Sequence, residues 1–153
     1  MNLDLKLKPN WSANLSLHLE RNKGKTKLVR HNHIGPLRVQ KQFSQEDGSC
    51  HIYILHPPGG LVGGDSLTVQ ISTGPDTQTL ITSPSASKAY RCSVNALPQS
   101  IDQKIEVAEN AHLEWLPQET IFYEGARTSI NSKVSMHSSS SFLGWEIQML
   151  GRR

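Results

Sequence analysis

The sequence predicts an all-β protein, and three observations support this. Apolar and polar residues alternate with a period of two along several short segments, as in strands with one buried face. Turn signals rich in Gly, Pro, Asn and Asp separate these segments roughly every ten to fifteen residues. No convincing amphipathic helix precedes residue 140, and no repeat of fixed period is detectable.

The N-terminal part contains four expected strands. The first covers residues 11–20, where Trp, Ala and Leu alternate with polar residues. A turn at residues 22–25 leads to a partner strand at 26–30, so we expect a hairpin. After a break at Gly35-Pro36 a strand follows at 37–43, and the more fully apolar segment 50–55 predicts a central strand.

The second part of the chain continues the pattern. Strands are expected at residues 67–71, 77–82, 100–107, 112–116, 120–123 and 130–136. Residues 83–91 are expected to be irregular or weakly strand-like.

The last segment, residues 142–150, has two interpretations. Phe142, Trp145, Met149 and Leu150 fall at helical spacing, with serines before them as caps and Gly151 after them. Alternate residues of the segment also fit a strand, but we favour a short helix. It is apolar on most sides, so we expect that a covering element is missing.

Composition and charge exclude several classes of protein. The net charge of +3 is mild and no run of like charges stands out, so nucleic-acid binding is not expected. No stretch is long enough to span a membrane, and residues 1–9 lack the apolar core of a secretion signal. The two cysteines, Cys50 and Cys92, are too few for a disulfide scaffold, so we expect a cytoplasmic protein with free thiols.

A loop at residues 56–65, His-Pro-Pro-Gly-Gly-Leu-Val-Gly-Gly-Asp, is the most demanding stretch of the sequence. Proline fixes φ and glycine allows close approach of another backbone, so the loop should be rigid and shaped. Gly59 and Gly64 have the spacing of a phosphate-binding loop, but Asp65 stands where that loop needs lysine. A carboxylate repels phosphate, so nucleotide binding is not expected.

Other motifs carry less weight. Ser85 and Lys88 match the S-x-x-K motif of an acyl-enzyme nucleophile, but they lie in a Ser/Pro-rich stretch without the helix that this motif needs. Glu114 and Glu119 flank an apolar centre, as glycosidase acids could, but a hydrogen-bonded turn is the simpler interpretation. The seven histidines lack the spacing of a closed metal site.

Several longer stretches together resemble one family. They are GPLRVQ at 35–40, CHIYILHPPGGLVGGD at 50–65, SKAYR at 87–91, LEWLPQETI at 113–121 and GWEIQMLGR at 144–152. The chain resembles the urease accessory proteins of the UreD/UreH type over nearly its whole length. The resemblance implies an irregular β-helix-like stack of strands with a small helical part. It also implies that residues 1–153 are one domain, incomplete at its C-terminal side.

The resemblance implies a non-enzymatic maturation factor. Such proteins bind urease apoprotein and UreF, which recruits the GTPase UreG, and the complex inserts nickel into urease with GTP hydrolysis. No tightly bound cofactor is expected, because nickel is cargo and the partner uses the GTP. The alternatives are a purely structural docking module and a non-functional truncated fragment.

The resemblance also suggests roles for individual residues. Asp65, Glu119 and His56 would contact nickel in transit. The remaining residues would shape the route: Gly59, Gly60, Gly63 and Gly64 as the structural loop, and Ser87 and Lys88 as polar lining. Isolated acids and histidines suit weak, transient metal binding better than a closed site does.

Overall fold

The computed structural model of the protein describes residues 10–152, which form thirteen strands and no helix. Residues 1–9, where the sequence shows no secretion signal, and residue 153 lie outside the described residues. Within residues 10–152 no helix is long and apolar enough to cross a bilayer. The strands are β1 (Ser12–Asn22), β2 (Lys25–Ile34), β3 (Arg38–Ser44), β4 (Cys50–Leu55), β5 (Ser66–Thr73), β6 (Gln78–Thr82), β7 (Ser87–Ala89), β8 (Gln99–Val107), β9 (His112–Leu116), β10 (Thr120–Tyr123), β11 (Thr128–Met136), β12 (Ser141–Gly144) and β13 (Gln148–Arg152).

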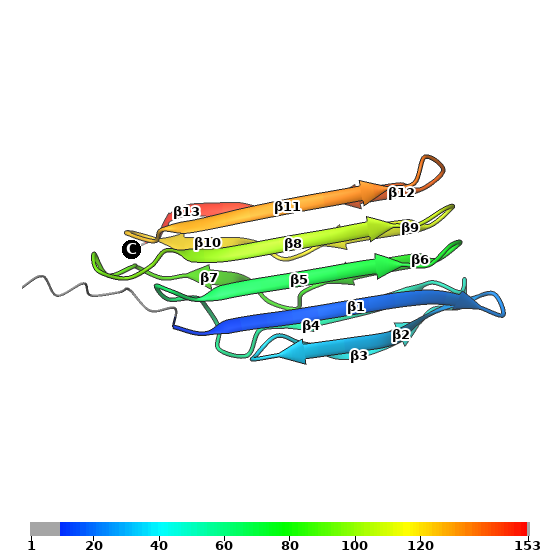
Figure 1. Cartoon of the computed structure of the whole chain (residues 1–153), viewed down its shortest axis with the longest axis horizontal. Helices are drawn as coiled ribbons and strands as arrows, with labels where there is room; N and C mark the ends of the chain where they lie inside the picture. The colour runs from blue at the N-terminus through cyan, green and yellow to red at the C-terminus, as the bar shows by residue number, and fades with distance from the viewer. Residues whose placement is uncertain (1–9, 153) are drawn as a thin grey trace, which may run out of the picture.

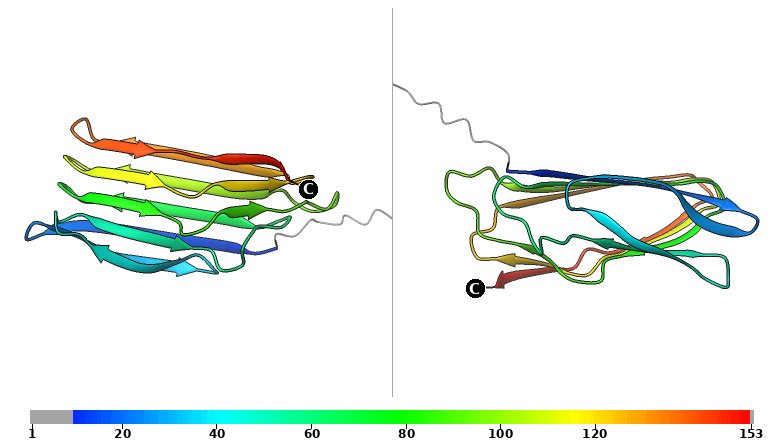
Figure 2. Two further views of the ribbon diagram at one scale, coloured as in Figure 1. Left: turned by 180° about the vertical axis from the view of Figure 1, so that it is seen from behind. Right: turned by 90° about the horizontal axis from the view of Figure 1, so that it is seen from below.

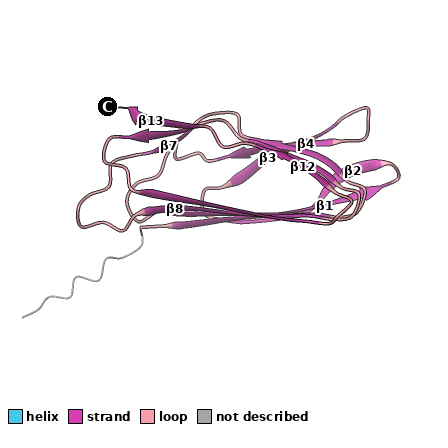
Figure 3. Ribbon diagram, turned by 90° about the horizontal axis from the view of Figure 1, so that it is seen from above, coloured by secondary structure: helices cyan, strands magenta, loops and turns pink. Residues whose placement is uncertain are grey.

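The strands build a three-faced stack of parallel coils. One sheet has the order β11-β8-β5-β1-β2, a second β12-β9-β6-β4-β3, and a third β13-β10-β7. The chain visits the three sheets in turn, so that β5-β6-β7, β8-β9-β10 and β11-β12-β13 are successive coils (Figure 1). Seen along the stack, the two long sheets converge at one end and the short third sheet lies near the other (Figures 2 and 3). The expected all-β, β-helix-like architecture is therefore confirmed.

The coils form a repeat that the sequence does not reveal. Leu67, Ile101 and Ile130 are register partners on consecutive strands, 34 and 29 residues apart. Of the five additional residues of the longer coil, four lie between β7 and β8 and one lies between β6 and β7. The two spacings differ, so the structural repeat has no fixed period, as the sequence predicts. Each interior position requires an apolar side chain but no particular one, so the repeat leaves no sequence identity.

The first four strands differ from the coils that follow. β1 pairs antiparallel with β2 and β3 antiparallel with β4, while β1 and β4 pair in parallel with β5 and β6. The expected hairpin at residues 11–30 is confirmed, and its second strand extends to Ile34. The stack thus begins with two hairpins.

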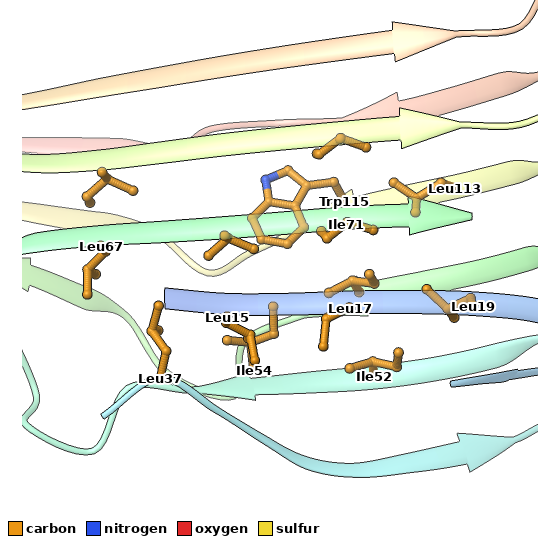
Figure 4. Close-up of a cluster of buried hydrophobic side chains, with 14 of the residues drawn as sticks. Leu15, Leu17, Leu19, Leu37, Ile52, Ile54, Leu67, Ile71, Leu113 and Trp115 are labelled. Carbon is orange, nitrogen blue, oxygen red and sulfur yellow. The ribbon is translucent and has the colours of Figure 1, made fainter. Parts of the chain in front are cut away.

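The core lies between the sheets, where alternate residues of each strand point inward (Figure 4). The strictly alternating burial of β1, β5 and β8 matches the period of two in the sequence. Its fully buried side chains include Leu15, Leu17, Leu19, Ile52, Ile71, Ile81, Ile105 and Leu113. Cys50 and Cys92 are free, as predicted, and both are buried.

The expected helix over residues 142–150 is wrong. β12 and β13 occupy this segment and pair in parallel with β9 and β10. Pairing in register with the preceding coil decides between two local periodicities that fit equally well. The interior rows continue into this coil but are uncovered there: Ile105 is 2% exposed and its partner Val134 37%, Val107 3% and its partner Met136 49%. We call this uncovered side of β11, β12 and β13 the open end.

Candidate functional site

The Gly/Pro loop occupies the first position of the third sheet. Leu61 forms a parallel bridge with Ala89 of β7. Its amide donates to the Lys88 carbonyl at 2.7 Å, and its carbonyl accepts from the Tyr90 amide at 2.9 Å. The loop is therefore a strand-like rung of the stack and connects β4 to β5 on the third face.

The structure explains why glycine occupies four positions of the loop. Gly59 and Gly64 adopt φ of 75° and 88°, in the left-handed region that favours glycine. A Cβ on Gly60 would lie 2.5 Å from Tyr90 Cε2, and one on Gly63 2.7 Å from Ala96 Cβ. Two glycines set the bends and two allow close packing, as expected for a rigid loop.

Asp65 is buried and holds the end of the loop. Its Oδ2 accepts from the Val62 amide at 2.8 Å, and its Oδ1 accepts from Asn10 Nδ2 at 2.8 Å. The two oxygens thus close a turn and tie the start of the described chain to the loop. Asp65 does not line the cavity described below.

Gln99, at the start of β8, holds the same loop through its side chain, and the sequence analysis did not predict this role. Its Nε2 donates to the carbonyls of Leu61 (3.3 Å) and Tyr90 (2.7 Å), and its Oε1 accepts from Thr128 Oγ1 at 2.6 Å. The side chain is fully buried. A single glutamine at the start of a strand carries no local signal for this role.

A cavity of about 140 Å³ lies inside the stack, between the three sheets. Residues from the first coil to the last line it, among them Leu37, Ile54, His56, Gly59, Leu67, Val69, Ser83, Ser85, Ser87, Ile101, Gln103, Trp115, Gln118, Ile130, Glu146 and Gln148. Its wall is mostly apolar with a few polar groups, and exposed residues such as Ser85 and Gln118 place its edge near the surface. The volume exceeds what one water needs, so there is room for several.

His56 is the titratable group of the loop that lines the cavity. Its Nε2 is buried and has no hydrogen-bond partner among residues 10–152, and the same holds for Trp115 Nε1 on another wall of the cavity. Burial lowers the pKa of His56 below its ordinary value, and the negative charge of Asp65 opposes this shift. A neutral imidazole with a free ring nitrogen can bind a borderline metal ion.

The structure brings together part of the predicted site. His56, Gly59 and Ser87 line the cavity, whereas Asp65, Lys88 and Glu119 do not. Among residues 10–152, no three His, Cys, Asp or Glu side chains converge in a group that could hold a metal ion. The role of these residues in nickel transit stays a prediction.

A serine–histidine–glutamate cluster on the outer face of the second sheet was not predicted. His112 Nδ1 lies 2.7 Å from Ser141 Oγ, and Nε2 lies 3.2 Å from Glu114 Oε1. His18 on β1 makes the same pattern of contacts with its neighbours, at 2.8 and 3.2 Å. The recurrence of the pattern on another sheet indicates cross-strand pairing rather than an active site.

Comparison with known proteins assigns the family. The family model described as UreD urease accessory protein matches residues 12–153. The chain belongs to the UreD family of urease accessory proteins. The match spans the loop and the cavity-lining strands, whereas Asn10, which donates to Asp65, precedes it.

Curated relatives support the assignment. The chain is 46% identical to the urease accessory protein UreD of Klebsiella aerogenes over 147 residues, covering 95% of this chain and 53% of the relative. It is 44% identical to the UreD of Polynucleobacter asymbioticus over 147 residues, covering 95% and 50%. It is 43% identical to a putative urease accessory protein UreD homolog of Escherichia coli O157:H7 over 145 residues, covering 95% and 58%. The chain spans about half the length of these relatives, which are named as accessory proteins and not as enzymes.

Proposed function

We propose that the protein acts in urease maturation as a non-enzymatic scaffold of the complex that inserts nickel into the urease active site. The family assignment over residues 12–153 supports the urease role. The finer role rests on the cavity, which is the observation that carries the proposal.

The cavity has the properties required of a route for a metal ion. It extends from the surface into the stack, and it touches all three sheets. A mostly apolar wall with few donors holds an ion weakly, so the ion can leave again. His56 offers a free ring nitrogen on this wall, and Ser87 and Gln103 offer oxygens.

The partners and cargo follow from the same proposal. Nickel is the cargo, no cofactor is resident, and a UreG-type GTPase supplies the GTP hydrolysis. A UreF-type protein and the urease apoprotein bind the scaffold, and the process takes place in the cytoplasm. Asp65 and Glu119, which lie off the cavity wall, would then shape or guard the route rather than line it.

One observation favours a second candidate, a purely structural docking module. Both Asp65 oxygens are engaged in hydrogen bonds that hold the loop. In this alternative the loop serves packing alone, and no nickel crosses the stack. Loop variants would then retain UreF binding and give no nickel-dependent signal.

A chimera tests the proposal directly. The 147 matched residues of Klebsiella aerogenes UreD are replaced by those of this chain. The chimera is expressed with urease and its other accessory proteins in cells that lack UreD. We expect nickel-dependent urease activity well above that of cells without any UreD, because the domain supplies the missing function.

Two variants of the chimera test the route. Ser87→Leu adds bulk to the cavity wall and should lower urease activation while UreF binding persists. Ser129→Leu places the same side chain at an exposed position and should not. Equal activation by both variants excludes transport through the cavity and favours the docking module, and a chimera with no activity contradicts the maturation role.

A further inference from the structure

Positive charge is concentrated on and next to the edge strands β2 and β3, although the net charge of the whole chain is small. Residues 21–44 contain seven of the sixteen Lys and Arg residues and no Asp or Glu. The rest of the chain holds nine Lys and Arg against thirteen Asp and Glu, a formal charge of −4. Charge is therefore separated between one end of the stack and the remainder.

These cations lie at one end of the stack. β2 and β3 are the outer strands of the two long sheets at the same end of the stack (Figure 1). The Leu28 amide on β2 donates to Gln42 Oε1 on β3 at 2.8 Å, which joins the two edges. Six exposed cations lie on β2, on β3 or in the turn that joins β1 to β2: Lys23, Lys25, Lys27, Arg30, Arg38 and Lys41. We call this surface the basic edge.

The charges of the basic edge are not neutralised within the described part of the chain. None of its six cations belongs to an ion pair of residues 10–152. Glu20 lies opposite Lys27 in the β1–β2 register, but its carboxylate contacts His18 at 3.2 Å. Unpaired like charges at short range repel one another, so a ligand of opposite charge relieves the repulsion.

The basic edge also presents features that a polypeptide recognises. At the hairpin end of β2, the amides of Thr26 and Leu28 are bonded to residues of the β3–β4 hairpin. Residues 29–34 make no backbone hydrogen bond to any other described residue beyond the ladder with β1. Val29 and Ile34 expose 51% and 67% of their surfaces there. An extended segment can add to such an edge through main-chain hydrogen bonds.

We propose that the basic edge docks an extended acidic segment of a partner protein, which pairs with the free edge of β2 at residues 29–34. Acidic side chains on one face of the segment lie beside Lys27 and Arg30 on the outer face of β2, and the charge of Lys41 on β3 adds to the attraction. The charge and the open ladder are independent observations that agree on one ligand.

The same features argue against a nucleic acid as the ligand. Surfaces that bind single-stranded nucleic acids combine basic groups with aromatic platforms for stacking. Phe43 is the aromatic side chain on β3, and Lys41 Nζ already lies 5.5 Å from the centre of its ring. A strand edge with free amides and carbonyls, flanked by aliphatic side chains, matches a peptide backbone instead.

Binding of a synthetic peptide to the whole chain tests the proposal. The probe is a peptide of about ten residues that alternates Glu with Val, the pattern of an added strand. We expect saturable binding that weakens with salt. The variant Lys27→Glu/Arg30→Glu/Lys41→Glu should weaken binding about tenfold or more, since three exposed charge pairs turn repulsive. The matched variant Lys104→Glu/Lys133→Glu/Arg152→Glu reverses three exposed cations elsewhere and should leave binding unchanged.

A second probe separates strand addition from charge attraction. N-methylation of alternate residues of the peptide removes the donors that strand addition needs, and it should abolish binding. Unchanged binding of the methylated peptide, or equal weakening by both triple variants, overturns the proposal. Tighter binding of duplex DNA or of phosphatidylserine vesicles than of the peptide, at the same salt concentration, also overturns it. A complete lack of peptide binding does so too, and it would mean that the cations only protect the strand edge from aggregation.

Discussion

Replacing Asp65 by alanine should destabilise the protein strongly, whereas asparagine should be tolerated. The buried carboxylate accepts two hydrogen bonds of 2.8 Å, from the Val62 amide and from Asn10 Nδ2. A hydrogen bond to a charged group contributes about 1.5–3 kcal/mol, and an orphaned buried donor costs about 1–3 kcal/mol. Because these contributions overlap, we expect Asp65→Ala to lower the free energy of unfolding by about 3–5 kcal/mol.

Asparagine preserves the shape and most of the bonding. Its oxygen can accept from the Val62 amide, and its NH₂ can donate to Asn10 once that amide rotates to present its own oxygen. The charge is lost but no donor is orphaned, so the expected loss is about 1 kcal/mol. Urea unfolding monitored by circular dichroism measures both variants. A loss below about 1 kcal/mol for Asp65→Ala would refute the argument that these bonds hold the loop.

Three further predictions concern the loop, the cavity and the open end. Gly60→Ala should lower the free energy of unfolding in urea by about 1–3 kcal/mol, because the new Cβ would lie 2.5 Å from Tyr90 Cε2. Gly24→Ala, where a Cβ would meet no described atom within 4 Å, should cost about 1 kcal/mol for its left-handed φ alone. Equal costs for the two variants would contradict the packing argument. The folded state lowers the pKa of His56, so the unfolded chain binds more protons and stability should be lost as the pH falls below about 6.5 through the folded pKa. Urea denaturation between neutral and mildly acidic pH measures this loss of stability. His56→Gln should make the loss smaller, whereas His31→Gln at an exposed position should not. The same pH dependence for the wild type and His56→Gln would disagree with the burial of the imidazole. Met136→Lys together with Met149→Lys should reduce self-association of the 153-residue chain in light scattering, because both methionines lie half-exposed at the open end; unchanged scattering would mean that association uses another surface.

Local patterns predicted most of the strands because each strand buries every second residue. β4, β9 and β10 have the bounds that the alternation and turn signals predict, and β1 differs by two residues or fewer at each end. The helix expected at residues 142–150 is wrong because the segment fits both periods. Trp145 and Met149 fall at helical spacing with Phe142, and they also alternate with polar or small residues as in a strand. The pairing of β12 with β9 and β13 with β10 decides the matter, and a single segment contains no information on it.

The candidate site shows the same division between local and distant information. The glycines and prolines of residues 56–65 predict a rigid loop from their own chemistry. The reasons for Gly60 and Gly63 lie in Tyr90 and Ala96, and the second partner of Asp65 is Asn10, 55 residues away. The roles of residues with distant partners can be recognised only once the coils are stacked. The role of Gln99 was not predicted for the same reason.

The antiparallel hairpins at the start of the stack have a consequence for the order of folding. β1–β2 and β3–β4 join strands that are close in sequence, so they close short loops, whereas paired strands of successive parallel coils lie 28 to 34 residues apart. Loop-closure entropy favours the hairpins as the nucleus, on which each coil then templates the next. The molecule should therefore assemble in one direction, and amide hydrogen-exchange protection should decline from β5 through β8 to β11.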